Sequence, residues 1–473
     1  MKTRTRYAPS PTGYMHIGNL RTAIFEYLVA KHDGGDFILR IEDTDQQRKV
    51  EGAIDFIYDT LNLCNIKIDE GPNNHGEYGP YIQSERKEIY NKYAHELVEK
   101  GKAYYCFCSE ERLEELRKKA EVHKVAFMYD GHCSKLGKEE IEKRLKNKEP
   151  YVIRQKMPKI GKSTFNDLVY GKINVENKIL EDQILLKSDG YPTYNFANVI
   201  DDHLMQITHV IRGNEYLSQT PKYNLLYEAF GFEPPKYIHV PMVLGEDKNK
   251  LSKRNGDASF MDLYHEGYLP NAIVNYLALL GWSPKENKEI FSMEELIKDF
   301  DPTRISKSPA VYDIKKLQWI NSHYIKNMEE KDYLNFVMPY LKEQYKLENY
   351  DNNWLQNLAL LYKNELKYGK EIIPLTKMFF EDNYTLNQEE QEFMNTEGVD
   401  KTINCFKEKI KTIEWTTENI KNAILEVKNE CNVSGKMLYM PIRIKTTGLM
   451  HGPELDKTIY LLGQHKIMER LSK

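Results

Sequence analysis

Hydrophobic positions change their spacing along the first 42 residues of the chain. Residues 3–8, TRTRYA, are typical of a short strand. The apolar residues that follow it recur at helical spacing, and they are Ile17, Leu20, Ile24, Tyr27 and Leu28. Gly34-Gly35 is a helix stop, and the segment DFILRIE at 36–42 predicts a second strand. A strand, a helix and a strand within about 40 residues predict a βαβ unit, and therefore a parallel sheet.

The middle of the chain mixes predicted strands with charged helical stretches. Paired cysteines at 106–108 precede a charged helical run. The alternation typical of strands occurs in segments 151–157, 163–175 and 182–196, and mixed αβ pattern returns at 207–216 and 237–245. We therefore expect an inserted α+β segment over residues 106–190, between the two halves of an α/β domain at 1–105 and 191–325.

From about residue 320 the apolar positions follow helical spacing. Three predicted helix faces are made of Leu355, Leu358, Tyr362 and Leu366, of Ile403, Phe406 and Ile410, and of Ile420, Ile424, Val427 and Cys431. Thr416-Thr417 is an N-cap signal and Gly435 a helix stop. The pattern predicts an all-α domain over residues 326–473.

Composition excludes several classes of protein. The chain has 473 residues and a net charge of -4, so there is no global basic field for a polyanion, and binding would need local patches. No apolar run reaches the ~18 residues of a membrane span, and no apolar core of a secretion signal follows Met1. Six cysteines do not form the pattern of a disulfide framework. We expect a cytoplasmic protein that does not enter a membrane.

The loop APSPTGYMHIGN, residues 8–19, lies where a ligand should bind. Ligands of parallel sheets bind beyond the carboxyl ends of the strands, where Pro9, Ser10, His16 and Glu42 fall. A helix N-terminus favours an anion, and the absent side chain of Gly18 would let a nucleotide approach the backbone closely. Taken alone, this pattern is more often a histidine that caps a helix.

A second cationic segment, KLSKRNG, covers residues 250–256. Lys250 and Lys253 follow a predicted strand and would neutralise charge on a triphosphate if the loop folded over it. A solvated basic turn is the commoner meaning of such a segment alone. The chain has no GxxxxGK[ST] and no well-placed GxGxxG, so its phosphate site would be of another kind.

Together the two segments are more informative than either alone. HIGN and KLSKR resemble the two signatures of class I aminoacyl-tRNA synthetases, although the first often ends in a second histidine where this chain has Asn19. Further segments indicate which family of this class the chain resembles: RIEDTD at 40–45, DEGP at 69–72, and residues 191–216 and 267–282. The chain resembles the bacterial type of glutamyl-tRNA synthetase almost from end to end, less densely after about residue 325.

The resemblance implies a fold and a reaction. The fold is a Rossmann-type catalytic domain with a parallel sheet, an inserted segment that binds the acceptor end, and an all-α anticodon-binding domain. The reaction activates L-glutamate with ATP to glutamyl-adenylate, releasing pyrophosphate, and transfers the glutamyl group to the 3′-terminal adenosine of tRNA(Glu) in protein biosynthesis. Mg²⁺ is expected on the phosphates, and the usual form of the family is a monomer.

The resemblance also implies roles for individual residues. The expected ATP site comprises Pro9, Ser10, His16, Gly18, Asn19, Lys250, Leu251, Ser252, Lys253 and Arg254. Within it, His16, Lys253 and, as a weaker candidate, Lys250 are expected to be catalytic through charge neutralisation. The expected glutamate site comprises Arg6, Ala8, Ser10, Glu42, Tyr194, Asn198 and Arg212.

The resemblance carries specific expectations for single residues at or near the glutamate site. Arg6 matches the arginine that holds the side-chain carboxylate, and Glu42 the acidic residue near the ammonium. Tyr216 stands where some relatives carry tryptophan. Without the resemblance, Arg212 would be read as a surface ion pair with Asp201 or Asp202, and Glu42 as part of a strand-end salt bridge.

Three cysteines of the inserted segment could begin a zinc site. Zn²⁺ takes four ligands of N, S or O type, and Cys106, Cys108 and Cys133 would supply three of them. Relatives that bind zinc here have a histidine where this chain has Lys135, so Tyr129 or His132 would complete the set; some related small synthetases use a tyrosine at that spacing. Ordinary half-buried thiols remain the alternative, as they do for the core positions Cys64, Cys405 and Cys431.

Transfer RNA is the expected macromolecular partner. Its phosphates would be met by basic residues, for which the candidates are Arg117, Lys118, Lys119, Lys436, Arg443 and Lys445, each of which is individually more typical of solvated charge. Charging of tRNA(Gln) as well as tRNA(Glu) stays open.

Four alternative functions fit parts of the sequence. A glutamyl-Q-tRNA(Asp) synthetase lacks the long helical tail, and glutaminyl enzymes read the anticodon with β-barrels. A nucleotidylyltransferase with an HxGH-type site explains neither RIEDTD nor the last third of the chain. A non-catalytic tRNA-binding paralogue would be expected to have lost His16 or Lys253, and both are present.

Overall fold

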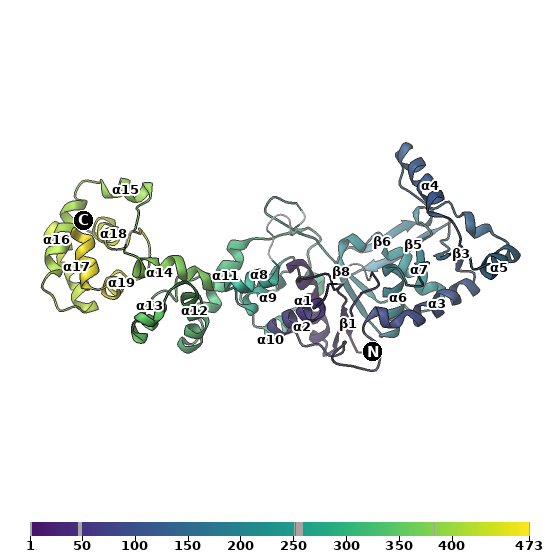
Figure 1. Ribbon diagram of the computed structural model, residues 1–473, viewed down its shortest axis with the longest axis horizontal. Coiled ribbons are helices and arrows are strands. Elements are labelled where there is room, and N and C mark those ends of the chain that lie inside the picture. The colour runs from purple at the N-terminus through teal and green to yellow at the C-terminus, as the bar shows by residue number, and fades with distance from the viewer. Residues whose placement is uncertain (1, 46–49, 250, 252–258, 383, 473) are drawn as a thin grey trace. The chain divides into compact units, whose positions relative to one another are not determined.

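The computed structural model describes residues 2–45, 50–249, 251, 259–382 and 384–472. The chain folds into two compact units, one formed by Met1–Leu263 with Ile273–Asp313 and the other by Tyr264–Ala272 with Ile314–Lys473. Figure 1 shows strands and helices in the first unit and helices throughout the second. Within the described ranges, no helix is both long and apolar enough to cross a membrane.

The N-terminal βαβ unit is confirmed. Strand β1 (Arg4–Tyr7) leads through the polar loop into α1 (Ile17–His32), and β2 (Asp36–Leu39) returns parallel to β1 with Arg6 opposite Ile38. Eleven residues of α1 are buried, so this helix packs on nearly all sides. The loop between β1 and α1 therefore leaves the sheet at its carboxyl edge, as predicted.

A four-stranded sheet forms the centre of the first unit, with the order β6-β5-β9-β8. Its strands are β5 (Lys162–Asp167), β6 (Gly171–Glu176), β8 (His209–Gly213) and β9 (Lys236–Val240). β8 and β9 are parallel, and the Thr208 N–H donates to the Arg4 carbonyl at 2.9 Å, which joins this sheet to β1. The predicted parallel core is present, and the antiparallel hairpin β5–β6 extends it into a mixed sheet.

The hairpin belongs to the segment that the sequence marks as inserted. The other strands of this part of the chain form a separate antiparallel sheet of order β3-β4-β7. They are β3 (Ala103–Cys106), β4 (Val152–Gln155) and β7 (Ile184–Leu186). Two charged helices flank it, α4 (Glu110–Val122) and α5 (Lys138–Lys146). The segment is thus α+β, as predicted.

One predicted strand in this segment is too long. The alternation at 182–196 predicts a strand throughout, but β7 covers only Ile184–Leu186 and α6 begins at Tyr194. A turn at Asp189-Gly190 reverses the chain, where the Lys187 N–H donates to the Tyr191 carbonyl. Gly190 has a φ of +78°, which ends the strand.

The remaining elements of this part of the chain surround the sheets. They are α2 (Ala53–Leu63), α3 (Lys87–Glu99), α6 (Tyr194–Leu204), α7 (Thr220–Phe230), β10 (Val243–Leu244), α10 (Met293–Asp299) and β11 (Ala310–Val311). Two helices, α8 (Phe260–Glu266) and α9 (Pro270–Leu279), contribute residues to both units.

The second unit is helical, as predicted for the end of the chain. Its helices are α11 (Ile314–Lys326), α12 (Glu330–Gln344), α13 (Asn352–Leu361), α14 (Ile372–Phe380), α15 (Gln388–Met394), α16 (Val399–Ile410), α17 (Thr417–Cys431), α18 (Lys436–Thr447), α19 (Leu455–Leu462) and α20 (Gln464–Ser472). The residues of all three predicted faces are buried in one core. The sequence-based division at residues 105, 190 and 325 stays a prediction.

The ends of α17 follow the sequence signals only in part. Thr416 is its N-cap and accepts the Asn419 N–H, as predicted. The predicted stop at Gly435 is wrong, because α17 ends at Cys431 and Asn432 adopts the left-handed conformation with a φ of 52°. Asparagine is one of the few residues besides glycine that tolerate this conformation. Gly435 instead precedes α18 as its N-cap residue.

Candidate active site

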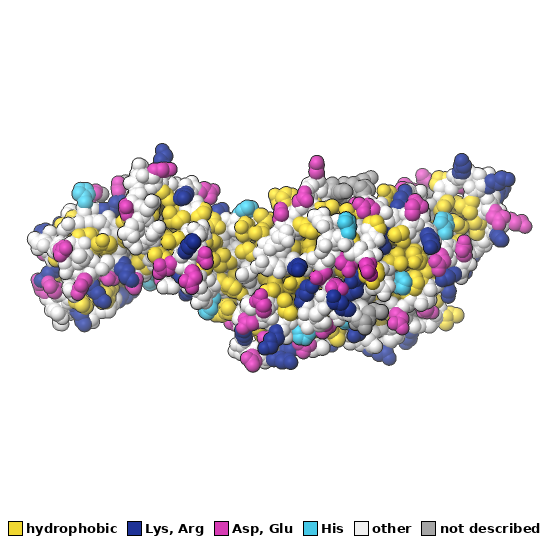
Figure 2. All heavy atoms as spheres, turned by 90° about the horizontal axis from the view of Figure 1, so that it is seen from below, with side chains coloured by type: hydrophobic (Ala, Val, Ile, Leu, Met, Phe, Trp, Pro, Cys, Tyr) yellow, Lys and Arg dark blue, Asp and Glu magenta, His cyan; other side chains and the backbone are white. Residues whose placement is uncertain are grey.

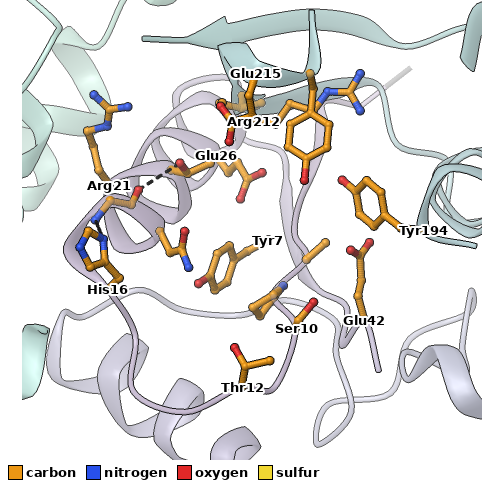
Figure 3. Close-up of a pocket in the computed structure, with 18 of the residues that line it drawn as sticks. Tyr7, Ser10, Thr12, His16, Arg21, Glu26, Glu42, Tyr194, Arg212 and Glu215 are labelled. Atoms are coloured by element: carbon orange, nitrogen blue, oxygen red, sulfur yellow. Dashed lines mark hydrogen bonds between the residues drawn. The ribbon is translucent and has the colours of Figure 1, made fainter. Parts of the chain in front are cut away.

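A cavity of about 570 Å³ opens at the carboxyl ends of β1, β2 and β8 (Figure 3). It brings together most of the predicted ATP-site and glutamate-site residues. They are Arg6, Ala8, Pro9, Ser10, His16, Gly18, Asn19, Glu42, Tyr194, Arg212 and Leu251. Asn198 is buried one turn further along α6. Lys250, Ser252, Lys253 and Arg254 lie outside the described residues.

His16 caps α1 at the wall of this cavity. Its Nδ1 accepts the Gly18 N–H at 3.0 Å, and its carbonyl accepts the Asn19 N–H at 2.9 Å. A Cβ on Gly18 would lie 3.2 Å from Nδ1, so the glycine makes room for the capping ring. Because Nδ1 is an acceptor, the neutral imidazole carries its proton on Nε2. The capping bond therefore leaves the ring N–H on Nε2, which is a buried atom.

Arg6 is almost completely buried between two carboxylates. Its Nε donates to Asp202 at 3.0 Å, and its Nη1 donates to Glu26 at 3.2 Å and to the Ile211 carbonyl at 3.4 Å. These bonds use three of the five guanidinium N–H groups. Arg6 can therefore offer a ligand only the N–H groups of Nη2, and not the full planar fork that the sequence suggests.

Glu42 lies three residues beyond the end of β2 and lines the cavity. Arg40 Nη2 donates to it at 3.1 Å, so the strand-end salt bridge considered from the sequence is present. The Glu42 N–H donates to the Pro9 carbonyl at 3.0 Å, which fastens the strand end to the first loop. Burial raises the pKa of Glu42 to about 7, against the opposing effect of Arg40 and Arg6.

Arg212 is held by side chains of β9 and α7. Its Nε donates to His239 Nε2 at 3.2 Å and its Nη2 to the Thr220 hydroxyl at 2.9 Å. The guanidinium carbon lies 5.2 Å from the ring centroid of Tyr216 and 4.6 Å from that of Tyr223. Arg212 thus keeps both N–H groups of Nη1 for a ligand, within an aromatic cage that favours a cation.

The two acidic residues considered as partners of Arg212 are bound elsewhere. Asp201 accepts from Arg86 Nε at 2.7 Å, and Asp202 accepts from Arg40 Nη1 at 2.7 Å as well as from Arg6. All of these side chains are buried. The surface ion pair considered as the alternative role of Arg212 is therefore not formed, because Asp201 and Asp202 already pair with three other arginines.

The predicted zinc residues also come together, away from the cavity. Sγ of Cys106, Cys108 and Cys133 all lie within 4.8 Å of one another. The Tyr129 hydroxyl is 3.4 Å from Cys106 Sγ and 3.3 Å from Cys108 Sγ. His132, the other considered ligand, is exposed.

Two family models match the chain. Residues 2–319 match the catalytic domain of class I tRNA synthetases (E and Q), and residues 332–473 match an anticodon binding domain. A protein from Clostridium novyi named glutamate–tRNA ligase is 50% identical over 456 residues, covering 96% of this chain and 93% of the relative. The chain belongs to the glutamate–tRNA ligases.

Further relatives of this ligase match it along nearly its whole length and carry the same name. A glutamate–tRNA ligase from Clostridium botulinum strain Hall is 49% identical over 474 residues, covering 99% of this chain and 97% of the relative. The crystal structure of a glutamate tRNA ligase from Elizabethkingia meningosepticum in complex with its amino acid is 36% identical, with a TM-score of 0.88 and coverage of 100% and 99%. The resemblance read from the sequence is confirmed, and the protein is a class I aminoacyl-tRNA synthetase.

The helical second unit of this ligase also bears on the alternatives. The anticodon-binding match over 332–473 argues against a synthetase that lacks this domain, and the helical fold against one built on β-barrels. The catalytic-domain match over 2–319 leaves no support for an unrelated nucleotidylyltransferase.

Sequence reasoning missed several side chains of the site. Glu26 lies in the cavity wall, and burial raises its pKa well above the ordinary value. A signal was present, because Glu26 stands between Phe25 and Tyr27 in the apolar run of α1, where a carboxylate needs a buried partner. His239 on β9 accepts from Arg212, and Asp167 on β5 bonds His239; no local sequence pattern connects these two residues.

Proposed function

We propose that the cavity is the place where this ligase joins L-glutamate to ATP. The observation that supports the proposal is the charge pattern of its wall. Two buried arginines, Arg6 and Arg212, line the cavity together with Glu42. His16 stands at the N-terminus of α1 (Figure 3). Glutamate has a carboxylate side chain that suits the arginines and an ammonium group that suits Glu42, and the phosphates of ATP suit the N-terminus of α1.

The arginines divide the recognition of the glutamate side chain between them. Arg212 offers Nη1 and Arg6 offers Nη2, so the carboxylate would be bound by two guanidinium groups instead of one fork. Tyr194 and Tyr216 stand beside Arg212 with ring centroids 5.6 Å apart and form an aromatic wall. Glu42 binds the ammonium when its carboxyl is ionised. Glutamine lacks the negative charge that two arginines require, and it would bind poorly.

The nucleotide occupies the part of the cavity next to α1. Ser10, Asn19 and Leu251 line it, and we propose that His16 offers its Nε2–H to phosphate. The reaction is attack of a glutamate carboxylate on the α-phosphate with pyrophosphate as the leaving group, for which the protein supplies positioning and charge neutralisation. Mg²⁺ bound to the phosphates neutralises part of their charge. Lys250 and Lys253 are proposed to do the same from the segment outside the described residues.

ATP–pyrophosphate exchange tests this assignment. We expect exchange with L-glutamate in the presence of tRNA, and Arg212→Ala to raise the KM for glutamate by about tenfold or more while the KM for ATP stays within about twofold. Exchange with glutamine as good as that with glutamate would refute the assigned pocket.

The glutamyl group is proposed to pass to tRNA(Glu), with the enzyme acting as a monomer in the cytoplasm. Exposed basic residues on α4, namely Arg117, Lys118 and Lys119, and Lys436 at the start of α18 are candidates for phosphate contacts. Arg443 is a weaker candidate because it is half-buried and donates to the Pro453 carbonyl. Figure 2 shows basic and acidic side chains interspersed on the visible face, as expected for a chain with a net charge of -4.

Aminoacylation with purified tRNA(Glu) and tRNA(Gln) separates a specific enzyme from one that charges both. We expect tRNA(Glu) to be charged. A chain that charged tRNA(Gln) equally well would be the non-discriminating alternative. Size-exclusion chromatography checks the proposed monomer.

Zinc is proposed for the cysteine cluster, with Tyr129 as the fourth ligand. Three sulfur atoms and a phenol oxygen converge there, and thiolates with an oxygen ligand suit Zn²⁺. The metal would fasten β3 to the turn that carries Cys133. Metal analysis of the purified protein should show zinc, less in Cys133→Ser, and an unchanged content in His132→Ala. A native protein purified without chelator that held no zinc would refute the proposal.

A further inference from the structure

A buried histidine connects Arg212 to an aspartate of the inserted segment. His239 on β9 lies with its Nε2 3.2 Å from Arg212 Nε and its Nδ1 2.6 Å from Asp167 Oδ2. The side chains of His239 and Asp167 have no exposed surface. The three groups therefore form a chain of hydrogen bonds that ends at the wall of the proposed glutamate pocket.

The positions of the protons in this chain follow from its donors. Arginine Nε has an N–H and no lone pair to accept with, so His239 Nε2 must be the acceptor. His239 then carries its proton on Nδ1 and donates it to Asp167. The Thr220 hydroxyl, 3.2 Å from Nε2, gives its own proton to the Tyr216 carbonyl at 2.9 Å. Burial lowers the pKa of His239 against the raising effect of Asp167, and the charge of Arg212 acts in the same direction as burial.

Asp167 is fixed firmly enough to set this tautomer. Its Oδ1 accepts the N–H groups of Val169 at 2.9 Å and Tyr170 at 2.8 Å, and its Oδ2 also accepts the His239 N–H at 3.0 Å. It ends β5 at the position where this strand pairs with Tyr237 of β9. The carboxylate is thus held by backbone on both sides.

We propose that Asp167 and His239 are positioning residues for glutamate recognition. By holding Nε of Arg212, they turn its Nη1 toward the pocket, and they do so only while His239 is neutral with its proton on Nδ1. Neither residue touches the substrate. The inference rests on the proposed binding of the glutamate carboxylate by Arg212.

Asp167→Asn should change the tautomer of His239 while keeping the size and shape of the side chain at position 167. If its amide nitrogen faced Val169 and Tyr170 it would meet two backbone N–H donors, so it should face His239, where only one backbone donor lies. There it would donate to Nδ1 and move the histidine proton to Nε2, which opposes the Nε–H of Arg212. We expect the KM for glutamate to rise by about tenfold, with the KM for ATP within about twofold of native.

A double-mutant cycle separates this effect from general damage. In His239→Gln the side-chain amide oxygen can accept from Arg212 without depending on a tautomer. We therefore expect His239→Gln to bind glutamate better than His239→Leu, and Asp167→Asn to have little further effect on the KM in the His239→Gln background. Asp182→Asn is the matched control, since Asp182 is a buried aspartate of the same segment that accepts from Tyr104 and Met157.

Two outcomes would overturn the proposal. The first is an unchanged KM for glutamate in Asp167→Asn, and the second is an equal increase in both backgrounds, which a purely structural role predicts. Arg212→Ala, measured alongside, identifies a different failure. If it leaves the KM for glutamate unchanged, the proposed pocket is wrong; if it raises the KM and Asp167→Asn does not, only the positioning role is wrong.

Discussion

The affinity for glutamate should fall as the medium becomes more acidic, because of Glu42. Its carboxyl is buried beside the cavity, and burial raises its pKa to about 7. In the proposed complex only the ionised form attracts the substrate ammonium. Protonation below neutral pH therefore removes a binding partner, and the apparent KM for glutamate should rise as the pH falls.

The size of the effect follows from the ionised fraction. A group with a pKa of about 7 is about nine-tenths ionised at pH 8 and about one-tenth ionised at pH 6. If only the ionised enzyme binds, the apparent KM is divided by this fraction and rises about tenfold between the two values. The side-chain carboxyl of free glutamate, with an ordinary pKa of about 4.3, stays ionised across this range.

The assay is ATP–pyrophosphate exchange with tRNA present, at a series of glutamate concentrations and several pH values from about 6 to about 8. Glu42→Gln is the matched variant, because it keeps the size of the side chain and cannot ionise. Its KM should be higher than native at pH 8 and should hardly change with pH. A native KM that is constant over this range, or a variant that shows the same tenfold change, would refute the reasoning.

Three further predictions concern chemistry and stability. His16→Ala and Lys253→Ala should each lower the rate of adenylate formation far more than the affinity for glutamate, measured by exchange kinetics; equal turnover to native would contradict their roles. Asp202→Ala should lower the free energy of unfolding in urea by about 3–5 kcal/mol, because it leaves two buried arginines with one partner fewer, and Asp202→Asn should cost less. Phe406→Ala, which removes a fully buried ring of α16, should cost about 3–5 kcal/mol, whereas Leu425→Ala at a 39% exposed site of α17 should change the urea midpoint little.

Local patterns predicted those parts of the fold that depend on nearby residues. The spacing of Leu20 and Ile24 predicted α1, and the charged run after Cys108 predicted α4, because amphipathic or charged periodicity is a property of the segment itself. The strand predicted at 182–196 failed beyond Leu186, since a left-handed glycine and a turn end it there. The position of a helix end, such as that of α17 before Asn432, depends on single residues. Asn432 and Gly435 both favour an end, and the sequence does not show which of them is used.

The candidate site was predictable to the extent that it lies on motifs. His16, Glu42 and Arg212 stand in long stretches that resemble one family, and the cavity collects all three. The partners of these residues were not predictable in the same way. Asp202 and His239 reach the site by tertiary contacts across the sheet. The sequence therefore could not show that Asp202 occupies an N–H group of Arg6, or that His239 bonds Arg212.

The pairing of Asp167 with Tyr237 makes the insertion inseparable from the domain that receives it. A shortened enzyme made by excising residues 106–190 would expose one edge of β9 and leave His239 without its acceptor. Such a minimal version should aggregate and discriminate amino acids poorly, even though every residue at the cavity wall would still be encoded. Any engineered replacement of this segment would have to preserve strand β5 and the carboxylate of Asp167 at its end.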